Sequence, residues 1–223
     1  MKISVIVPVF NGEKYLAATL ERAINQNMTQ TSLEIELIVV IDGSSDQSEQ
    51  IAQRYGAKII HQQNLGPGAA RNTGIKHSTG EHLAFLDQDD LWHPDKLRLQ
   101  LEVLQHGDYA ICRSNAQLEI DALEHSSKIR QGYANHAINP TLSALLIERM
   151  VFLHVGYFDP QYRTASDTDW FARAKQLGLK AVCPEQTLLR KRFHTFNQGH
   201  DTSRTTAELL RVLRASVQRK RNP

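Results

Sequence analysis

The chain has 223 residues, of which 41% are hydrophobic and 22% are charged, and its formal net charge is +2. This composition is typical of a soluble globular protein, and the length suits one large domain or a domain with an appendage. A charge this small does not require nucleic acid as a partner, and no stretch reaches the ~20 apolar residues of a membrane span. Cys112 and Cys183 form neither a disulfide framework nor a metal-ligand pattern, so we expect two buried, reduced thiols in a cytoplasmic protein.

The first half of the chain alternates predicted strands and helices with short connections. Apolar, β-branched runs predict strands at 3–9, 34–42, 57–62, 81–87 and 108–114. Helical spacing, caps and stops predict helices at 13–26, 44–56, within 64–75 and at 94–105. The first helix should bury Leu16, Leu20, Ala23 and Ile24 on one face. This order favours an α/β fold with a parallel sheet covered on both faces, in which ligands bind beyond the carboxyl ends of the strands.

After about residue 115 the pattern loosens. The polar stretch 119–140 predicts a long loop or lid, and 141–150 predicts a helix. A further helix is expected at 167–180, with Phe171, Ala174 and Leu177 facing inward and Gly178 as its stop. Strands are expected within 180–194, followed by a basic helix to the end of the chain.

Three carboxylates stand within four residues where the predicted strand 81–87 ends: Asp87, Asp89 and Asp90. Two like charges about 4 Å apart repel by roughly 4 kcal/mol at an effective dielectric constant of about 20. Hard oxygen ligands suit Mg²⁺ or Mn²⁺ held together with substrate phosphates, and such an ion would remove the repulsion. The alternative is an acidic cap for the helix that begins at Pro94, which is the role we assign to Asp90.

Charged residues near other element ends have two interpretations each. Asp42 follows the second strand, where it can contact a ribose or base, or simply form a turn with Gly43. Arg71 can present a planar fork to a diphosphate, or lie on the surface. Asp167 and Asp169 begin a predicted helix, either as caps or with one of them as a general base.

A basic stretch lies close to the predicted strands of the second half. Arg190, Lys191 and Arg192 can neutralise a leaving diphosphate, and His194 can join a metal site. The alternative is a solvated basic loop.

Together, four stretches in chain order resemble the motifs of glycosyltransferase family 2, the inverting nucleotide-sugar transferases of the GT-A fold. They are "ISVIVPVFNGEKYL", "VVIDGSSDQS", "NLGPGAARNTGI" and "FLDQDDLWHPDKL", and the resemblance extends from residue 3 to about residue 195. It implies a mostly parallel, Rossmann-like central sheet flanked by helices. It also implies a domain over 1–200, divided into a nucleotide-sugar-binding half (1–114) and an acceptor half (115–200), with a separate basic helix over 201–223.

The resemblance also implies roles for individual residues. Asp89 would be the main ligand of Mg²⁺ or Mn²⁺, with Asp87 and His194 beside it, and Asp167 would be the base that deprotonates the acceptor hydroxyl. The donor, most simply a UDP-sugar, would be bound by Pro8, Val9, Phe10, Asn11, Glu13, Asp42, Arg71, Asp87 and Gln88. The acceptor would be a saccharide or a lipid-linked saccharide.

Two residues depart from the family motifs. Ile41 stands where an Asp is usual, and Ser166 stands where a Glu usually precedes the base. These departures leave open a relative that binds nucleotide sugar without catalysis. A sugar nucleotidyltransferase is a further alternative, although its Gly-rich, basic signature is missing after the first strand.

The C-terminal helix has an apolar stripe beside several basic residues. Leu209, Leu210, Leu213 and Val217 form the stripe. We expect this helix to pack on its own domain or on a second subunit; the alternative is peripheral contact with the inner face of a membrane.

Overall fold

The computed structural model describes residues 1–27, 33–107, 109–120, 141–194 and 202–221. The predicted loop or lid at 119–140 therefore lies almost wholly outside the described residues. Within them, no helix has both the length and the apolar character needed to cross a bilayer.

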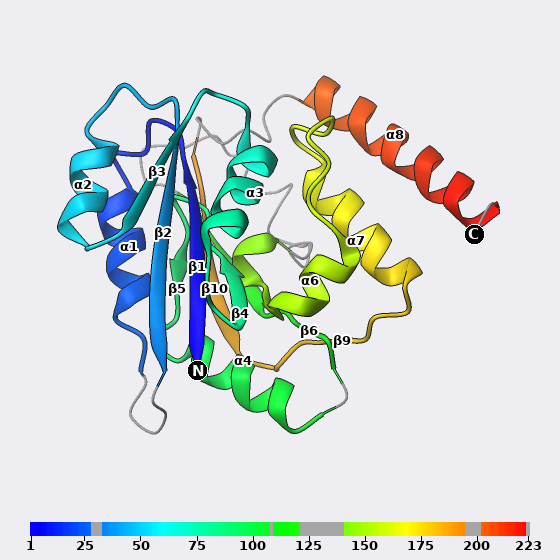
Figure 1. Ribbon diagram of the computed structural model, residues 1–223, viewed down its shortest axis with the longest axis horizontal. Helices are drawn as coiled ribbons and strands as arrows, with labels where there is room; N and C mark the ends of the chain where they lie inside the picture. Colours follow the sequence, from blue (N-terminus) through cyan, green and yellow to red (C-terminus); the bar gives the residue numbers. More distant parts are fainter. Residues whose placement is uncertain (28–32, 108, 121–140, 195–201, 222–223) are drawn as a thin grey trace.

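A mostly parallel sheet forms the centre of the molecule (Figure 1). Its seven strands have the order β3-β2-β1-β4-β8-β6-β9. Strands β3, β2, β1 and β4 run parallel, whereas β8 runs antiparallel to its neighbours β4 and β6. The bounds are β1 (Lys2–Val9), β2 (Glu34–Asp42), β3 (Lys58–Gln62), β4 (His82–Phe85), β6 (Ile111–Cys112), β8 (Leu146–Glu148) and β9 (Ala181–Val182).

Helices cover both faces of this sheet, as the alternating pattern predicts. The described helices are α1 (Leu16–Ile24), α2 (Ser48–Arg54), α3 (Pro67–His77), α4 (Lys96–Gln105), α6 (Arg149–Val155), α7 (Ser166–Gln176) and α8 (Thr202–Arg221). Successive residues of β1 divide between the two faces because side chains of a strand alternate. Val5 and Val7 pack in the cluster that contains Leu16 of α1, whereas Ile6 packs with Ile75 of α3.

A second, smaller sheet lies behind the central strands in the view of Figure 1. It has three strands in the order β5-β10-β7, with the bounds β5 (Leu91–Trp92), β7 (Asn115–Ile120) and β10 (Thr187–Phe193). Strand β10 pairs antiparallel with β5, which lies immediately after the three carboxylates. The basic stretch is therefore brought back to the acid cluster as a strand, as expected within 180–194, and the alternative of a solvated loop is wrong for residues 190–193.

The predicted helix at 141–150 is wrong. The segment forms a single 3₁₀ turn (Leu142–Ala144), then β8, and only then the start of α6. A short buried apolar run fits a strand as well as a helix, and periodicity alone does not separate the two. Here pairing with β4 makes the segment a strand, since Ala84 pairs with Leu146 and Leu83 pairs with Ile147.

Three smaller expectations also fail. Ile24 is 37% exposed, and Thr19 is buried on the inner face of α1 in its place. Leu177 is 48% exposed because α7 ends at Gln176. Cys112 is buried as expected, but Cys183 is exposed.

Candidate functional site

The carboxyl ends of three parallel strands meet at one edge of the central sheet. Strand β1 ends at Val9, β2 at Asp42 and β4 at Phe85, so the residues that follow them are neighbours in space. In Figure 1 this is the edge opposite the N-terminus. The predicted positions Phe10, Asn11 and Asp42 all lie at this edge.

The loop after β1 is held by the loop after β2. Asn11 has a positive φ of 49°, and its side-chain oxygen accepts a hydrogen bond from the Ser45 amide at 2.9 Å. Glu13 accepts from the Gln47 amide at 3.1 Å. Asn11 and Glu13 thus use their side chains to fix backbone, whereas the ring of Phe10 stays 39% exposed at the end of the strand.

Gln88 connects the acid cluster to the same loop. Its side-chain oxygen accepts from the Phe10 amide at 2.8 Å, and its amide nitrogen donates to the Phe10 carbonyl at 3.1 Å. A side chain at Gly12 would come within 2.8 Å of this Gln88 oxygen, which explains the glycine. Pro8 and Val9 are buried in β1 beneath the loop.

Asp42 is buried and orders the start of the next loop. One of its carboxylate oxygens accepts from Gln62 at 2.7 Å and from the Leu65 amide at 2.9 Å, and the other accepts from the Gly66 amide at 2.9 Å. Three of its roughly four acceptor positions are therefore occupied within the protein.

Asp87 lies between two cations. Arg71 of α3 donates to one carboxylate oxygen at 2.5 Å, and the Lys191 ammonium of β10 lies 3.5 Å from the other. Burial opposes ionisation, but Arg71 and Lys191 outweigh it and lower the pKa of Asp87 to about 2. The Nε of Arg71 is buried and has no acceptor among the described residues.

Asp90 is fully buried and is not a helix cap. Helix α4 begins at Lys96, and the residue before it, Asp95, makes no side-chain cap. Asp90 lies 3.2 Å from the Lys191 ammonium and accepts from the Arg192 amide at 3.2 Å. Burial and the two neighbouring carboxylates raise the pKa of Asp90 despite Lys191. Its role is to attach β10 to the acid cluster.

Asp89 and His194 form a buried pair at the end of β10. The His194 Nε2 is 2.9 Å from an Asp89 carboxylate oxygen, and the imidazole stacks on the Tyr15 ring with centroids 4.7 Å apart. Adjacent ligands of a small octahedral ion stand about 3 Å apart, given metal–oxygen distances of about 2.1 Å. The spacing therefore fits two neighbouring ligands of Mg²⁺ or Mn²⁺. No group of three or more metal-binding side chains occurs in the part of the chain that the structure describes.

Asp167 lies in the first turn of α7 and is half-buried. Burial is the main reason that its pKa is raised; the Asp87 charge adds to the shift and Arg71 opposes it. The charges around the acid cluster thus affect the pKa of Asp167, although Asp167 lies 80 residues after Asp87 in the chain. Asp169, the other acid of this turn, is occupied by Arg173 at 2.9 Å and Arg219 at 3.2 Å.

The glycines of the loop before α3 allow it to approach α7. A side chain at Gly68 would lie 3.0 Å from the Ser166 hydroxyl oxygen. Gly66, with a φ of 92°, faces Arg163 in the same way, and Asn64 is hydrogen bonded to Arg163. This contact places Arg71 and Asp167 on adjoining helix starts.

Sequence analysis missed two residues that organise the site. Ser143 accepts from the Asp87 amide at 3.0 Å, and its carbonyl accepts from the Trp92 indole at 2.8 Å. Asn72 exchanges two hydrogen bonds with the backbone of Phe158, at 2.8 and 3.0 Å. Asn72 belongs to a quoted motif and could have been singled out, whereas Ser143 lies in the segment wrongly expected to be helical.

Both departures from the expected motifs are buried. Ile41 packs in the core on the side of α1 and α2, so it faces away from Asp42. Ser166 lies beneath Gly68.

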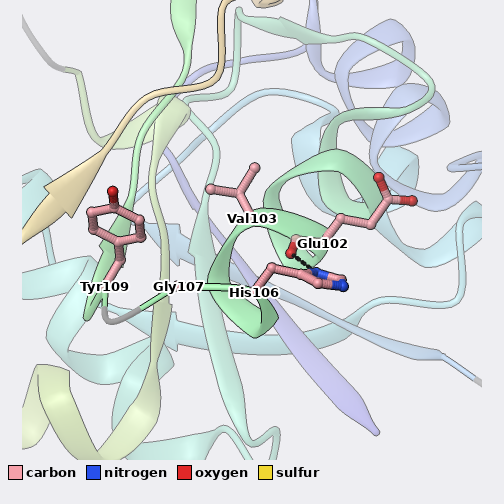
Figure 2. Close-up of a pocket in the computed structure, with 5 residues that line it drawn as sticks. All are labelled: Glu102, Val103, His106, Gly107 and Tyr109. Carbon is pink, nitrogen blue, oxygen red and sulfur yellow. Dashed lines mark hydrogen bonds between the residues drawn. The ribbon is translucent and has the colours of Figure 1, made fainter.

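A shallow surface depression lies elsewhere. Figure 2 shows its lining at the end of α4, formed by Glu102, Val103, His106, Gly107 and Tyr109. It shares no residue with the acid cluster, and Figure 1 places α4 at the opposite edge of the sheet.

Comparisons with known proteins agree on one family. The model of the family described as "Glycosyl transferase family 2" matches residues 4–163. An uncharacterized glycosyltransferase of Rickettsia typhi is 35% identical over 211 residues, which cover 86% of this chain and 64% of that protein. One from Rickettsia conorii is 37% identical over 217 residues, covering 86% of this chain and 34% of that protein. The chain thus spans between about a third and two thirds of these relatives.

Solved structures show the same fold at lower identity. TarS of S. aureus (residues 1–349, in complex with UDP-GlcNAc) has a TM-score of 0.71 and 22% identity, covering 90% of this chain and 61% of that one. The mannosyltransferase PcManGT of Pyrobaculum calidifontis, in complex with GDP-Man and Mn²⁺, has a TM-score of 0.75 and 17% identity, covering 97% and 64%. The likeness confirms the expected mixed α/β fold of GT-A type.

Proposed function

This chain belongs to glycosyl transferase family 2, and from that membership we propose that it transfers a sugar from a nucleoside-diphosphate sugar to a hydroxyl acceptor. The observation that carries the proposal is the convergence of Arg71, Asp89 and Asp167 at one edge of the sheet, from three separate elements. A UDP-sugar is the proposed donor, since TarS is described with UDP-GlcNAc, and a GDP-sugar is the alternative, since PcManGT is described with GDP-Man.

The donor would bind across the loops after β1, β2 and β4. The exposed ring of Phe10 offers a surface for the base, and Asp42 has one acceptor position left for a ribose hydroxyl or base N–H. The Arg71 guanidinium is held by Asp87 through Nη2, and its buried Nε has no acceptor among the described residues, so the guanidinium is the proposed donor to a phosphate oxygen.

Asp89 and His194 are the proposed ligands of Mg²⁺ or Mn²⁺. The remaining ligands would be diphosphate oxygens and water, as is usual when a protein supplies only one or two groups. When bound, the ion supplies positive charge that stabilises the leaving diphosphate. We assign Asp87 a different role from direct coordination, because both of its oxygens already face cations of the protein.

Asp167 is the proposed general base. Its raised pKa brings the carboxylate closer in proton affinity to the acceptor hydroxyl than an ordinary Asp. The acceptor oxygen attacks the anomeric carbon and loses its proton to Asp167, while the bond from that carbon to the diphosphate oxygen breaks. One in-line displacement of this kind inverts the anomeric centre.

An assay of donor turnover tests the proposal. UDP- and GDP-sugars are incubated with the chain and a panel of saccharide acceptors, in Mn²⁺ or in chelator, and the released nucleotide is identified. We expect a nucleoside diphosphate, released only with metal, and loss of release in Asp89→Asn. Asp95→Asn, the same substitution at the start of α4, serves as the matched control.

Release of pyrophosphate would instead indicate a nucleotidyltransferase. Donor binding without turnover across the panel would indicate a non-catalytic relative. Either result contradicts the proposal.

A further inference from the structure

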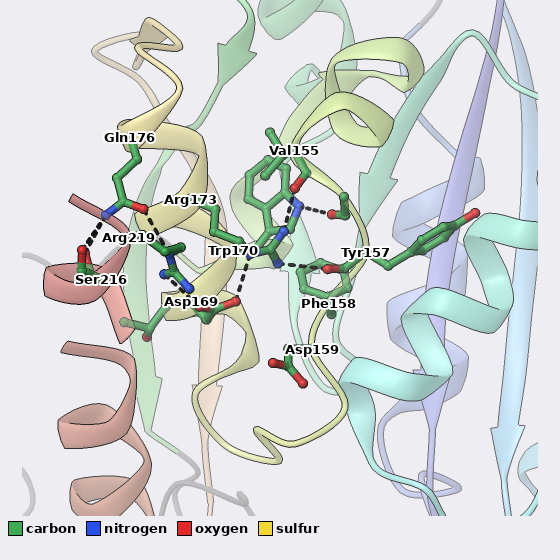
Figure 3. Close-up of polar contacts among 12 residues, drawn as sticks. Val155, Tyr157, Phe158, Asp159, Asp169, Trp170, Arg173, Gln176, Ser216 and Arg219 are labelled. Atoms are coloured by element: carbon green, nitrogen blue, oxygen red, sulfur yellow. Dashed lines mark hydrogen bonds and ion pairs between the residues drawn. The ribbon is translucent and has the colours of Figure 1, made fainter. Parts of the chain in front are cut away.

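Helix α8 has one face against the domain and one face outside it. On the inner face, Val212 is buried with Tyr162 and Ala165, as the expectation of packing on its own domain requires. Figure 3 shows the polar part of this contact, in which Gln176 of α7 donates to Ser216 and Arg219 reaches Asp169.

The inner face also reaches the start of α7. The Glu208 carboxylate, which is buried, accepts from the Thr164 amide at 2.7 Å, the Thr164 hydroxyl at 2.9 Å and the Ala165 amide at 3.1 Å. These residues directly precede the turn that carries Asp167. The orientation of α8 is therefore fixed relative to the candidate site.

The outer face is apolar and exposed. At about 100° per residue, four large apolar side chains fall within an arc of about 100° that is turned away from Glu208 and Val212. They are Leu209, Leu210, Leu213 and Val217, with exposed fractions of 37%, 51%, 62% and 49%. Apolar side chains gathered on one exposed face mark a surface that binds a partner.

The charge of α8 indicates what kind of partner this is. The helix has six basic residues and one acid, and that acid, Glu208, is turned inward. Arg214, Lys220 and Arg221 are exposed. At the same spacing, Arg214 and Arg221 lie beside the apolar arc and Lys220 lies within it. A second copy of the chain would place these basic flanks against each other, because a two-fold interface pairs the same surface with itself. Exposed apolar side chains next to basic residues instead suit a partner that has an apolar interior and an anionic surface.

We propose that the outer face of α8 binds an anionic lipid bilayer, with the helix lying in the plane of the interface. The apolar side chains would enter the headgroup–acyl boundary, and the flanking cations would face lipid phosphates. This inference goes beyond the transfer reaction and does not depend on it. Since Glu208 fixes α8 beside the start of α7, such binding would hold the domain that carries Asp167 at the bilayer surface.

Vesicle co-sedimentation tests the proposal. The full chain is mixed with vesicles of phosphatidylcholine alone or with phosphatidylglycerol, at low and at high salt. We expect binding only to the anionic vesicles, weakened by salt. Replacing both Leu210 and Leu213 with Ser should reduce binding roughly tenfold or more. Arg214→Gln with Lys220→Gln should reduce it about 25-fold, at about fivefold per charge.

Controls separate lipid binding from other causes. Met150→Ser removes an apolar side chain that is 72% exposed on α6 and should leave binding unchanged. Circular dichroism melts should be the same for all variants, because every replaced side chain is exposed.

Three results would overturn the proposal. The first is absence of binding to anionic vesicles at low salt, and the second is binding that the α8 variants leave unchanged. The third is a dimer in analytical ultracentrifugation that the double Ser variant dissociates, since the apolar face would then be covered by a second copy.

Discussion

Asp87 and Asp90 are balanced by the protein's own cations. Arg71 from α3 and Lys191 from β10 lie within 3.5 Å of these carboxylates, and the three Asp side chains outweigh burial to raise the pKa of Lys191. From the sequence alone, a metal was expected to relieve the repulsion of Asp87 and Asp89, with Asp90 as a helix cap. In the structure, the charges of Asp87 and Asp90 are instead balanced by cations of the protein itself. Asp89 is the one of the three that faces His194.

Replacing the proposed base, Asp167→Asn, should slow transfer strongly while leaving donor binding in place. We expect kcat to fall by about 10²- to 10⁴-fold, the usual contribution of a general base. In the native enzyme, kcat/KM should fall as pH decreases through the raised pKa of Asp167, because protonation removes the base. The acid limb should therefore lie above pH 3.8, the ordinary pKa of Asp.

Steady-state kinetics from pH 4 to pH 9 measure this. A variant with near-native kcat, or a native profile with no acid limb in this range, would exclude Asp167 as the base.

The site is assembled from elements that contact one another closely. Strand β10 returns to the acid cluster, where Lys191 meets Asp90 across 101 positions of sequence. Helix α3 meets the start of α7 at Gly68, where a Cβ would lie 3.0 Å from the Ser166 hydroxyl oxygen and 3.1 Å from its Cβ. The relative position of Arg71 and Asp167 thus depends on the absence of a Cβ atom at Gly68.

Gly68→Ala should separate these two helix starts. The added methyl group overpacks the contact, which typically costs about 1–3 kcal/mol, against a gain of about 1 kcal/mol from helix propensity. We expect the melting temperature to fall or to stay the same, and we expect kcat to fall. Adding Ser166→Gly removes both close atoms and should restore kcat in part, relative to Ser166→Gly alone. If the two substitutions act additively on kcat, the contact does not position the base.

The sequence predicts an element well when local residues determine its conformation, and poorly when contacts with distant parts of the chain determine it. Strands β1 and β2 are confirmed at almost their expected bounds, because a long β-branched run favours a strand on local grounds. Strand β8 was wrongly expected as helix, since its conformation is decided by the distant edge of β4. The role of Asp90 was likewise not predictable, since its partner Lys191 lies 101 positions away in the sequence.

At the scale of the whole molecule, the parallel part of the sheet carries the proposed donor site, and later elements add residues to it. Residues 4–163 match the family, and α7 and α8 lie beyond that match. The proposed metal pair joins these two regions, because Asp89 belongs to the matched part and His194 to the later part. The proposed base, Asp167, also comes from the later part.

The central claim is that donor and metal bind together at Asp89 and His194, separately from the base. Calorimetric titration of UDP, in Mn²⁺ and in chelator, tests it most directly on the native chain, His194→Ala and Asp167→Asn. We predict binding that requires Mn²⁺, is lost in His194→Ala and is retained in Asp167→Asn. Binding of equal strength in chelator, or binding that His194→Ala leaves unchanged, would contradict the account.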